Sequence, residues 1–271
     1  MENGNYATKR LPGLSGATLK LIAIITMVID HSAAVFLEPH LVAVGFDAHP
    51  LSHPLYPLFA ILRMLIGRIA FPIFCFLLVE GALKTRNIWK HLGRLAIFAL
   101  VSEIPFDWAL FEAPYYPHYQ NVFFTLFFGV LGIAFIEMIR KKGETAPGDT
   151  WILPVTKRIG EQFIWFLEKV LPSFGVAILC MLGAHFLHTD YGARGVFAIL
   201  LFYVFARSRM WQIVSASFSY VFLLSEVGAI FAFPVIAAYN NTRGKQLKYL
   251  FYVFYPGHLL LLVGLRALLG S

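Results

Sequence analysis

Long runs of apolar residues, separated by short polar stretches, divide this chain into segments of about 20 residues. Such runs lie near 18–38, 57–83, 91–112, 120–139, 170–188 and 249–269. About 20 apolar residues in a helix cross the hydrocarbon core of a bilayer. Residues 194–239 are apolar over a longer stretch, which Arg207, Arg209 and Glu226 divide into three shorter runs. The pattern predicts an all-α, polytopic integral membrane bundle with about nine transmembrane helices, eight or ten being the alternatives, in a single domain over residues 1–271.

Basic residues mark alternate loops between these runs. They are Lys9, Arg10, Lys84, Arg86, Lys90, Arg140, Lys141, Lys142, Lys157, Arg158, Arg207, Arg209, Arg243, Lys245 and Lys248. The intervening loops at 39–56, 112–119, 189–193 and 225–227 contain no lysine or arginine. By the positive-inside rule the N-terminal segment, residues 1–17, is cytoplasmic, and with nine spans the C-terminus lies outside. Residues 1–17 are polar, so we expect the first span to be retained as an anchor rather than removed as a signal peptide.

One extended polar insertion, residues 140–169, interrupts the series of apolar runs. We expect it to be a cytoplasmic loop that contains an interfacial amphipathic helix. That helix is predicted near 159–170, where charged and aromatic side chains alternate, namely Glu161, Glu168, Lys169, Phe163, Trp165 and Phe166.

Composition agrees with a membrane protein. The 271 residues are 59% hydrophobic and 14% charged, against about 25% charged residues in soluble chains. The net charge of +7 is spread over short loop clusters, which favours a lipid bilayer as partner and argues against nucleic acid. Cys75 and Cys180 each lie within an apolar run, so we expect reduced packing residues.

Asp30 and His31 stand side by side inside the first apolar run. A charge near the centre of a bilayer costs at least a few kcal/mol, so such residues mark functional sites. Lys20 precedes His31 by eleven residues, which places both on one helix face, about 16 Å apart along the axis. The first span therefore carries a cation at one membrane face and an imidazole near the middle.

The predicted topology brings other ionisable residues to the same depth. His31, Arg68, Glu103 and His258 lie on four different spans, each close to the centre of its span. Asp107 follows Glu103 by one turn, and Arg63 is nearer the outside. Charges at one depth on several spans predict a shared polar cavity.

The roles of these residues have more than one interpretation. Neighbours on a helix point about 100° apart, so we expect Asp30 to pair with an arginine of another span, Arg68 first. His31 then faces the cavity as a base or nucleophile. A purely structural ion-pair network is the alternative for Asp30, Arg68, Glu103 and Asp107. His258 could instead bond a carbonyl freed by Pro256, and Arg63 could bind an anion or extend to the surface.

We expect no metal site. His49 and His53 are four residues apart, but Pro50 and Pro54 oppose the helix that a zinc pair needs. Glu80 and Lys84 are spaced as an ordinary helix salt bridge. Ser15 is a candidate N-cap for the first span.

Several short motifs, in order along nearly the whole chain, resemble the TraX family. They are Gly13-Leu-Ser-Gly16, Leu19-Lys20, Met27-Val-Ile-Asp30-His31, Gly67-Arg68-Ile-Ala-Phe-Pro-Ile-Phe74, Glu80-Gly81, Arg94-Leu95, Ser102-Glu103-Ile-Pro-Phe-Asp107, Gln120-Asn121-Val-Phe-Phe-Thr125, Thr189-Asp190-Tyr-Gly192 and Phe254-Tyr-Pro-Gly-His258. The namesake of this family acetylates the amino terminus of conjugative pilin in the bacterial inner membrane. Lys20 and His31 also resemble the spacing of a basic residue and a histidine in acyltransferase-3 proteins.

The resemblance implies a multi-pass acetyltransferase of the bacterial cell membrane, with acetyl-CoA as acyl donor and an extracytoplasmic acceptor, either pilin or a glycan of the envelope. Lys20, Arg86 and Arg94 would bind the donor's phosphates. His31 would be the base or nucleophile, with Asp30, Arg68, Glu103 and Asp107 around it. Arg63, Asn121, Thr125 and His258 are the candidates for binding the acceptor. A homo-oligomer is compatible with this reading.

Two other functions fit the same residues. The buried charges could form the proton relay or substrate path of a transporter or flippase. The chain could also be a scaffold for pilus or envelope assembly without catalysis.

Overall fold

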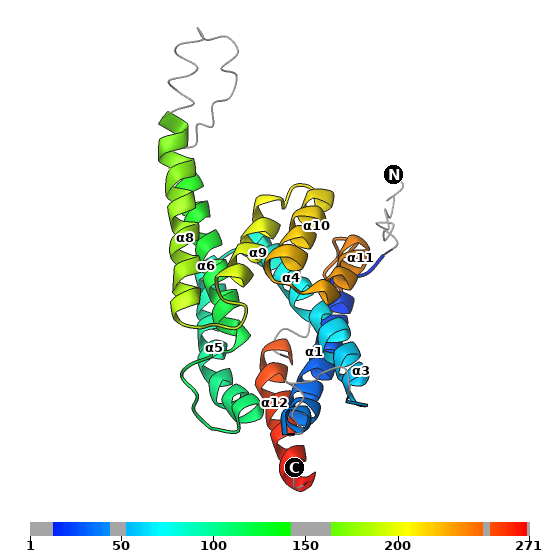
Figure 1. The fold of residues 1–271 in the computed structure, drawn as a ribbon. Coiled ribbons are helices and arrows are strands. Elements are labelled where there is room, and N and C mark those ends of the chain that lie inside the picture. The colour runs from blue at the N-terminus through cyan, green and yellow to red at the C-terminus, as the bar shows by residue number, and fades with distance from the viewer. Residues whose placement is uncertain (1–12, 44–52, 142–163, 246–249, 270–271) are drawn as a thin grey trace, which may run out of the picture.

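The computed structural model describes residues 13–43, 53–141, 164–245 and 250–269. Within these residues the secondary structure is helical, apart from isolated bridges between Leu14 and Tyr239 and between Gln120 and Thr189. The helices form an elongated bundle in which α6 and α8 run side by side along one edge (Figure 1). The predicted all-α class is therefore confirmed for the described part of the chain.

Two long helical paths begin the bundle, and both change their helix type along the way. The first runs through α1 (Gly16–Ser32), the π-helical η1 (Ala33–Leu37) and α2 (Glu38–Ala43). The second runs through α3 (Tyr56–Phe59), the π-helical η3 (Ala60–Ile66), the 3-10 turn η4 (Gly67–Ile69) and α4 (Ala70–Lys84).

The remaining helices follow in chain order. They are α5 (Ile88–Phe111), α6 (Val122–Lys141), η6 (Phe166–Val170), α8 (Leu171–Phe186), α9 (Gly192–Val204), α10 (Arg209–Phe218), η7 (Ser219–Leu223), η8 (Val227–Phe231), α11 (Ala232–Ala237) and α12 (Leu250–Leu269).

Each predicted apolar run corresponds to helix, but fewer helices have the length of a span. In the described residues, five are long and apolar enough to cross a membrane: Gly16–Ala43, Tyr56–Lys84, Val122–Lys141, Phe166–Phe186 and Tyr252–Leu269. The helix α5 has 24 residues, which is a sufficient length. By contrast, α9 has 13 residues, or about 20 Å, against a hydrocarbon core of about 30 Å.

The predicted interfacial helix is different in the structure. Residues 159–163 lie outside the described part of the chain. Residues 164–170 are helical and continue directly into α8. The helix continues through Glu168 and Lys169. The Lys169 ammonium donates a hydrogen bond to the Ile139 carbonyl near the end of α6, at 2.9 Å. Residues 164–170 are thus helical as part of a longer helix, and their place at the membrane interface stays a prediction.

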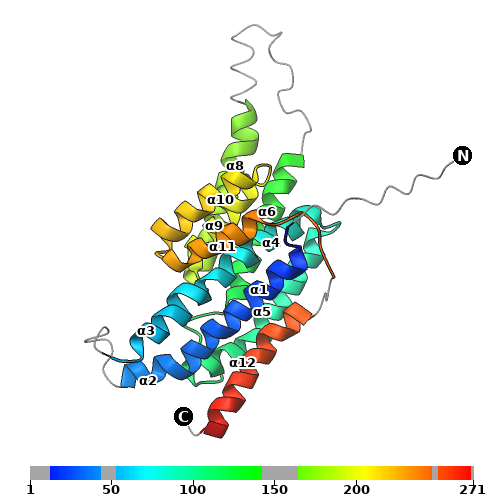
Figure 2. The same ribbon diagram turned by 90° about the vertical axis from the view of Figure 1, so that its right-hand side faces the viewer.

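The core lies where α1, α4, α5, α6, α9 and α12 pack together. The helix α1 packs on α4 and η4, α12 packs on α5, and α6 contacts α5, α8 and α9. In Figure 2, α1, α5 and α12 run alongside one another. Cys75 and Cys180 are free and buried in this core, as expected.

The start of α1 is fixed to the segment before α12. Ser15 is the predicted N-cap, and its Oγ accepts a hydrogen bond from the Thr18 N–H at 3.2 Å. The N–H groups of Gly16 and Ala17 donate to the carbonyls of Thr242 and Arg243, at 2.8 and 3.0 Å. These bonds hold the 238–244 segment beside Lys20 on the first turns of α1.

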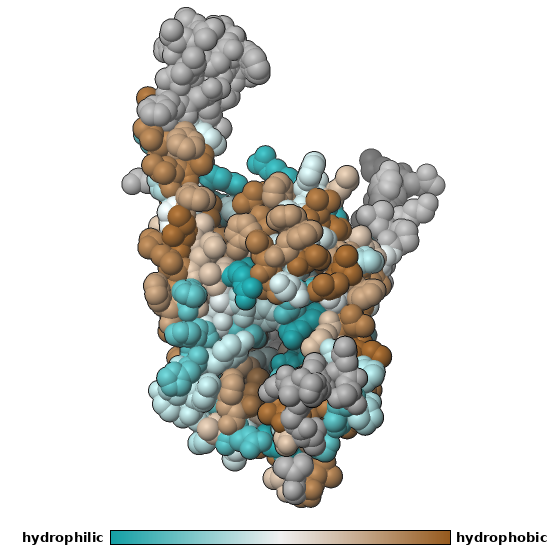
Figure 3. Space-filling model, in the orientation of Figure 1, coloured by the Kyte–Doolittle hydropathy of each residue, from teal (hydrophilic) through white to brown (hydrophobic). Residues whose placement is uncertain are grey.

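Apolar side chains also cover the outside of the bundle. Phe174, Leu179 and Phe186 on α8 are each more than 60% exposed. Figure 3 shows hydrophobic side chains over much of the upper half, and hydrophilic ones around a hollow near the centre and along the lower left of the same face. An apolar exterior around a polar interior suits a protein surrounded by lipid.

Candidate functional site

Two polar cavities are lined by side chains of α1. The histidine cavity, of about 320 Å³, is lined among others by Asp30, His31, Arg63, Arg68, Asp190 and Glu226. The basic cavity, of about 650 Å³, is lined among others by Lys20, Lys84, Arg86, Arg94, Arg243 and Glu80. Lys20 and His31 are separated by three helical turns, or about 16 Å, so one helix connects the two cavities.

His31 forms a pair with His258, which joins α1 to α12. His31 Nδ1 lies 2.7 Å from His258 Nε2, and the two rings are stacked with centroids 5.0 Å apart. His258 Nδ1 lies 2.9 Å from the Phe254 carbonyl. A carbonyl accepts only, so in the neutral pair His258 Nδ1 carries the proton and His258 Nε2 must accept from His31 Nδ1. His31 Nε2 is then left without a proton, on a side chain that lines the cavity.

His258 therefore does not bond the backbone carbonyl that Pro256 leaves free. Pro256 removes the N–H that would bond the Tyr252 carbonyl, whereas His258 donates to Phe254. Its other nitrogen fixes the tautomer of His31.

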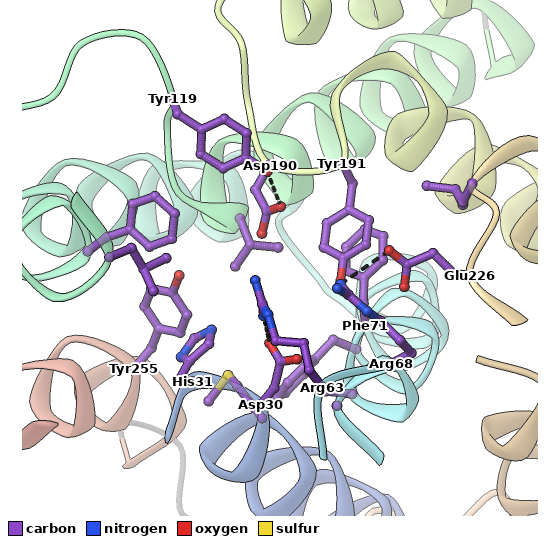
Figure 4. A pocket seen from close by; sticks show the side chains of 18 of the residues that line it. Asp30, His31, Arg63, Arg68, Phe71, Tyr119, Asp190, Tyr191, Glu226 and Tyr255 are labelled. Atoms are coloured by element: carbon purple, nitrogen blue, oxygen red, sulfur yellow. Dashed lines mark hydrogen bonds and ion pairs between the residues drawn. The ribbon is translucent and has the colours of Figure 1, made fainter. Parts of the chain in front are cut away.

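Asp30 pairs with Arg63, not with Arg68. Arg63 donates from Nη1 to Asp30 at 2.7 Å and from Nε to Glu38 at 3.1 Å. The expected Asp30 to Arg68 pair is wrong because η3 brings Arg63 opposite Asp30. Arg63 also does not extend to the surface. Figure 4 shows its guanidinium within the cavity beside Asp30, between His31 and Arg68.

Gly67 permits the close approach of the two helical paths. A Cβ at this position would collide with the Asp30 carboxylate. The helix changes from π to 3-10 geometry between Arg63 and Arg68, which alters the direction of the two arginine side chains. Irregular turns of this kind are frequent at functional sites.

Arg68 pairs with a carboxylate that the sequence did not indicate as a site residue. Its Nη1 lies 3.2 Å from Glu226, in the turn between η7 and η8. Arg68 also bonds the Tyr191 side chain, whose ring stacks on Phe71 with centroids 3.6 Å apart. Arg68 thus lines the cavity, held by groups from two later segments of the chain.

Asp190 completes the acidic side of the histidine cavity. Its carboxylate accepts a hydrogen bond from the Tyr119 hydroxyl at 2.8 Å. Burial raises the pKa of Asp190 to about 6. Burial also raises the pKa of Glu226 to about 7, against the opposing effect of Arg68. Both carboxyl groups lie in turns between helices.

The remaining predicted residues of the histidine site lie behind the cavity rather than on its wall. Glu103 accepts from both the side chain and the backbone N–H of Asn121. The Thr125 hydroxyl donates to the Asp190 carbonyl and lies 2.9 Å from the Thr189 hydroxyl. Asp107 accepts from the Tyr116 N–H at 2.7 Å. These groups hold the loops that carry Tyr119 and Asp190.

The basic cavity brings together the three residues predicted to bind the donor, Lys20, Arg86 and Arg94. Lys84 and Arg243 add two further cations to its lining. The single carboxylate among the described lining residues is Glu80, which pairs with Lys84 as expected from their spacing. The lining therefore has an excess of positive charge, which suits a ligand with several negative charges.

Asp190, Tyr191 and Glu226 were not predicted as site residues because they lie in short gaps between apolar runs. The backbone of these gaps is unusual at two positions, although Glu112, His188 and Asn241 also have positive φ values. Tyr191 and Ser225, beside Glu226, have positive φ values of 63° and 57°. Non-glycine residues in this conformation are uncommon and cluster at functional sites.

No metal centre is found in the part of the chain that the structure describes. No group of three or more His, Cys, Asp or Glu residues there could hold an ion. His49 lies outside the described residues. The rings of His40 and His53 contact each other edge to face, with centroids 5.9 Å apart.

Comparisons with known proteins agree on one family. The family described as TraX protein matches residues 15–266. The chain is 26% identical over 264 residues to the probable fimbrial assembly protein FimC, serogroup H1, of Dichelobacter nodosus, covering 94% of this chain and 97% of that protein. No solved structure matches the chain.

Proposed function

The chain belongs to the TraX family, and we propose that it is an integral membrane acetyltransferase. It would transfer an acetyl group from cytoplasmic acetyl-CoA to an acceptor at or across the bacterial cell membrane. The observation that carries the proposal is the arrangement of the two cavities on α1. A basic cavity contains Lys20, and three turns further along the same helix His31 lines a second cavity.

The basic cavity supports the donor end of this proposal. Coenzyme A carries a pyrophosphate and a further phosphate, and lysine and arginine bind phosphates through charge-assisted hydrogen bonds. Lys20, Arg86 and Arg94 are the residues we assign to them, with Arg243 held nearby by the bonds to the start of α1. The pantetheine arm would follow α1 toward His31.

The histidine pair supports the chemical step. His31 Nε2 takes the proton of an acceptor hydroxyl or amine while the acceptor attacks the thioester carbonyl. The bond from carbonyl carbon to sulfur then breaks, and the proton passes from His31 to the departing thiolate. Alternatively, His31 Nε2 attacks the thioester carbonyl, the carbon–sulfur bond breaks and the CoA thiolate leaves. The acetyl group then passes from Nε2 to the acceptor, whose proton goes to that thiolate. In both routes His258 fixes the tautomer of His31.

The other predicted residues are assigned by their positions. Arg63 and Arg68 lie on the cavity wall, where they can orient the acceptor or polarise the carbonyl. Asp30 holds Arg63 in place. Asn121, Thr125, Glu103 and Asp107 act indirectly, by holding the loops that carry Tyr119 and Asp190.

The acceptor is proposed to be a component of the cell envelope. The relative from Dichelobacter nodosus is named a fimbrial assembly protein, which favours a role in pilus assembly or modification and hence pilin, with an envelope glycan as the alternative. We further propose a multi-pass topology of nine segments with a cytoplasmic N-terminus, and kinship with acyltransferase-3 proteins.

A test of this function uses purified protein in proteoliposomes with radiolabelled acetyl-CoA and an envelope extract as the source of acceptor. We expect release of CoA and transfer of label by the wild type. His31→Ala should lower both rates by about 100-fold or more. His40→Ala is the matched control, since His40 is an exposed residue of α2 that lines neither cavity.

The same assay distinguishes the other functions. Equal CoA release by the wild type and His31→Ala would contradict the role of His31. Movement of a solute without consumption of acetyl-CoA would favour a transporter. Pilus assembly that depends on the chain but survives His31→Ala and Lys20→Ala would favour a scaffold.

A further inference from the structure

Tyr255 on α12 shares a wall of the histidine cavity with His31. Its side chain lines the cavity and is only 3% exposed. Its ring meets His31 edge to face, with centroids 5.9 Å apart, and meets His258 in the same way at 5.6 Å. Figure 4 shows the phenol next to the imidazole, with its oxygen directed away from α12.

The hydroxyl of Tyr255 differs from the other buried phenols of the core. Within the described residues it makes no hydrogen bond of normal geometry. By contrast, the buried Tyr203 donates to Glu137 and the buried Tyr220 to Cys75. A buried phenol almost always has a partner, so one without a partner calls for an explanation. The Val122 N–H faces the Tyr255 oxygen. An N–H group can only donate, so the proton of the Tyr255 hydroxyl remains available for another acceptor.

Each charged donor of the cavity has at least one acceptor in the protein. Arg63 is paired with Asp30 and Glu38, Arg68 with Glu226, and Arg194 donates to the Leu223 carbonyl at 2.8 Å. Beside His31, the Tyr255 hydroxyl is the donor whose proton has no acceptor in the described residues. A ligand in the cavity could therefore accept a hydrogen bond from the Tyr255 hydroxyl, close to the unprotonated Nε2 of His31.

We propose that Tyr255 is a catalytic residue whose hydroxyl binds the acetyl carbonyl oxygen, an inference that rests on the acetyltransferase function. When the nucleophile bonds to the carbonyl carbon, the electron pair of the carbonyl moves to its oxygen. The hydroxyl donates a hydrogen bond to that oxygen and keeps its own proton. When the carbonyl forms again, the bond to sulfur breaks and the thiolate receives the proton that His31 holds. A donor placed where the negative charge develops lowers the barrier for this step.

The first test is Tyr255→Phe, which removes the hydroxyl and keeps the ring. We expect kcat for acetyl transfer to fall by about 100-fold, with the KM for acetyl-CoA within twofold because the phosphates bind in the other cavity. The unfolding temperature should change little, because the hydroxyl proton has no acceptor in the described residues and only the Val122 N–H faces its oxygen. Tyr203→Phe is the control, since that hydroxyl bonds Glu137 outside both cavities. It should leave kcat unchanged.

A second measurement reports the contact without turnover. In a His31→Ala background, acetyl-CoA with a ¹³C-labelled carbonyl is bound, and its stretching band is followed by infrared difference spectroscopy. We expect the band at a lower frequency with Tyr255 present than in the His31→Ala/Tyr255→Phe double variant. Equal bands, an unchanged kcat, or a clear loss of stability in Tyr255→Phe would each overturn the role of Tyr255. A wild type that neither binds nor consumes acetyl-CoA would overturn the acetyltransferase function and this inference together.

Discussion

At the scale of single residues, Arg63 neutralises carboxylates on two successive elements of the first helical path. It pairs with Asp30 on α1 and with Glu38 on α2. Glu38 is 45% exposed at its side chain, whereas Asp30 is 13% exposed. Loss of Arg63 therefore leaves the largely buried Asp30 carboxylate without a cation, and an uncompensated buried charge is strongly destabilising.

We predict that Arg63→Met lowers the free energy of unfolding by about 3–5 kcal/mol, measured by denaturant unfolding in detergent. The double variant Arg63→Met/Asp30→Asn should recover a large part of this loss, because the unpaired charge is gone. If the double variant is as unstable as the single one, the ion pair is not the source of the effect.

Asp190 and Glu226 give a prediction for pH. Their folded pKa values, about 6 and about 7, lie above the usual values for an unfolded chain, about 4. Between these values the folded protein holds protons that the unfolded chain has released. The free energy of unfolding therefore decreases as the pH rises from about 4 to about 7. The decrease is complete once the pH exceeds the folded pKa values.

We therefore predict a higher unfolding temperature at pH 5 than at pH 8 in detergent, measured by scanning fluorimetry. In the double variant Asp190→Asn/Glu226→Gln this difference should become smaller, because neither amide titrates. An equally large difference in the double variant would mean that other groups cause it.

Charged site residues within the apolar runs could be predicted from the sequence, whereas those in the loops could not. Asp30, His31 and Arg68 are conspicuous because a charge within an apolar run is costly, and all three line the histidine cavity. Depth along a helix does not specify a partner, which is why Arg63 rather than Arg68 meets Asp30. Asp190 and Glu226 gave no such signal, because acidic residues are ordinary in loops.

At the scale of the elements, the site depends on irregular turns within the second helical path. The change from η3 to η4 positions Arg63 and Arg68, and Gly67 lets this stretch approach α1. The apolar pattern predicts a helix over 57–83 but not its π and 3-10 turns, because these depend on what packs against them. The packing of η4 on α1 and on η8 is made by segments distant in the sequence.

We predict that Gly67→Ala reduces the free energy of unfolding by about 1–3 kcal/mol, the usual cost of inserting a methyl group into a packed site. It should also reduce CoA release, since the added Cβ displaces Asp30. Gly93→Ala is the matched control, because a Cβ there meets nothing within 4 Å. The control should be neutral or slightly stabilising, because Gly93 lies inside α5, where alanine is the better helix former. Equal effects of the two substitutions would contradict the packing argument.

At the scale of the whole molecule, the proposed transfer needs the basic cavity to face the cytoplasm. The predicted topology most needs a test at α9, because this helix is short for a membrane span. Arg207 follows α9, and the positive-inside rule assigns its loop to the cytoplasm. Tyr115 follows α5 and belongs to a loop assigned to the outside. The two loops therefore test the predicted topology from opposite sides.

We predict that a cysteine at Tyr115, which is 73% exposed, reacts with a membrane-impermeant maleimide in intact cells. A cysteine at Arg207 should react only after the cells are permeabilised. The unsubstituted chain provides the background, since Cys75 and Cys180 are buried. Labelling of Arg207→Cys in intact cells would mean that α9 returns to the outer side without crossing. That result would remove two of the nine predicted spans, because α9 and the helix after it would then lie on one side of the membrane.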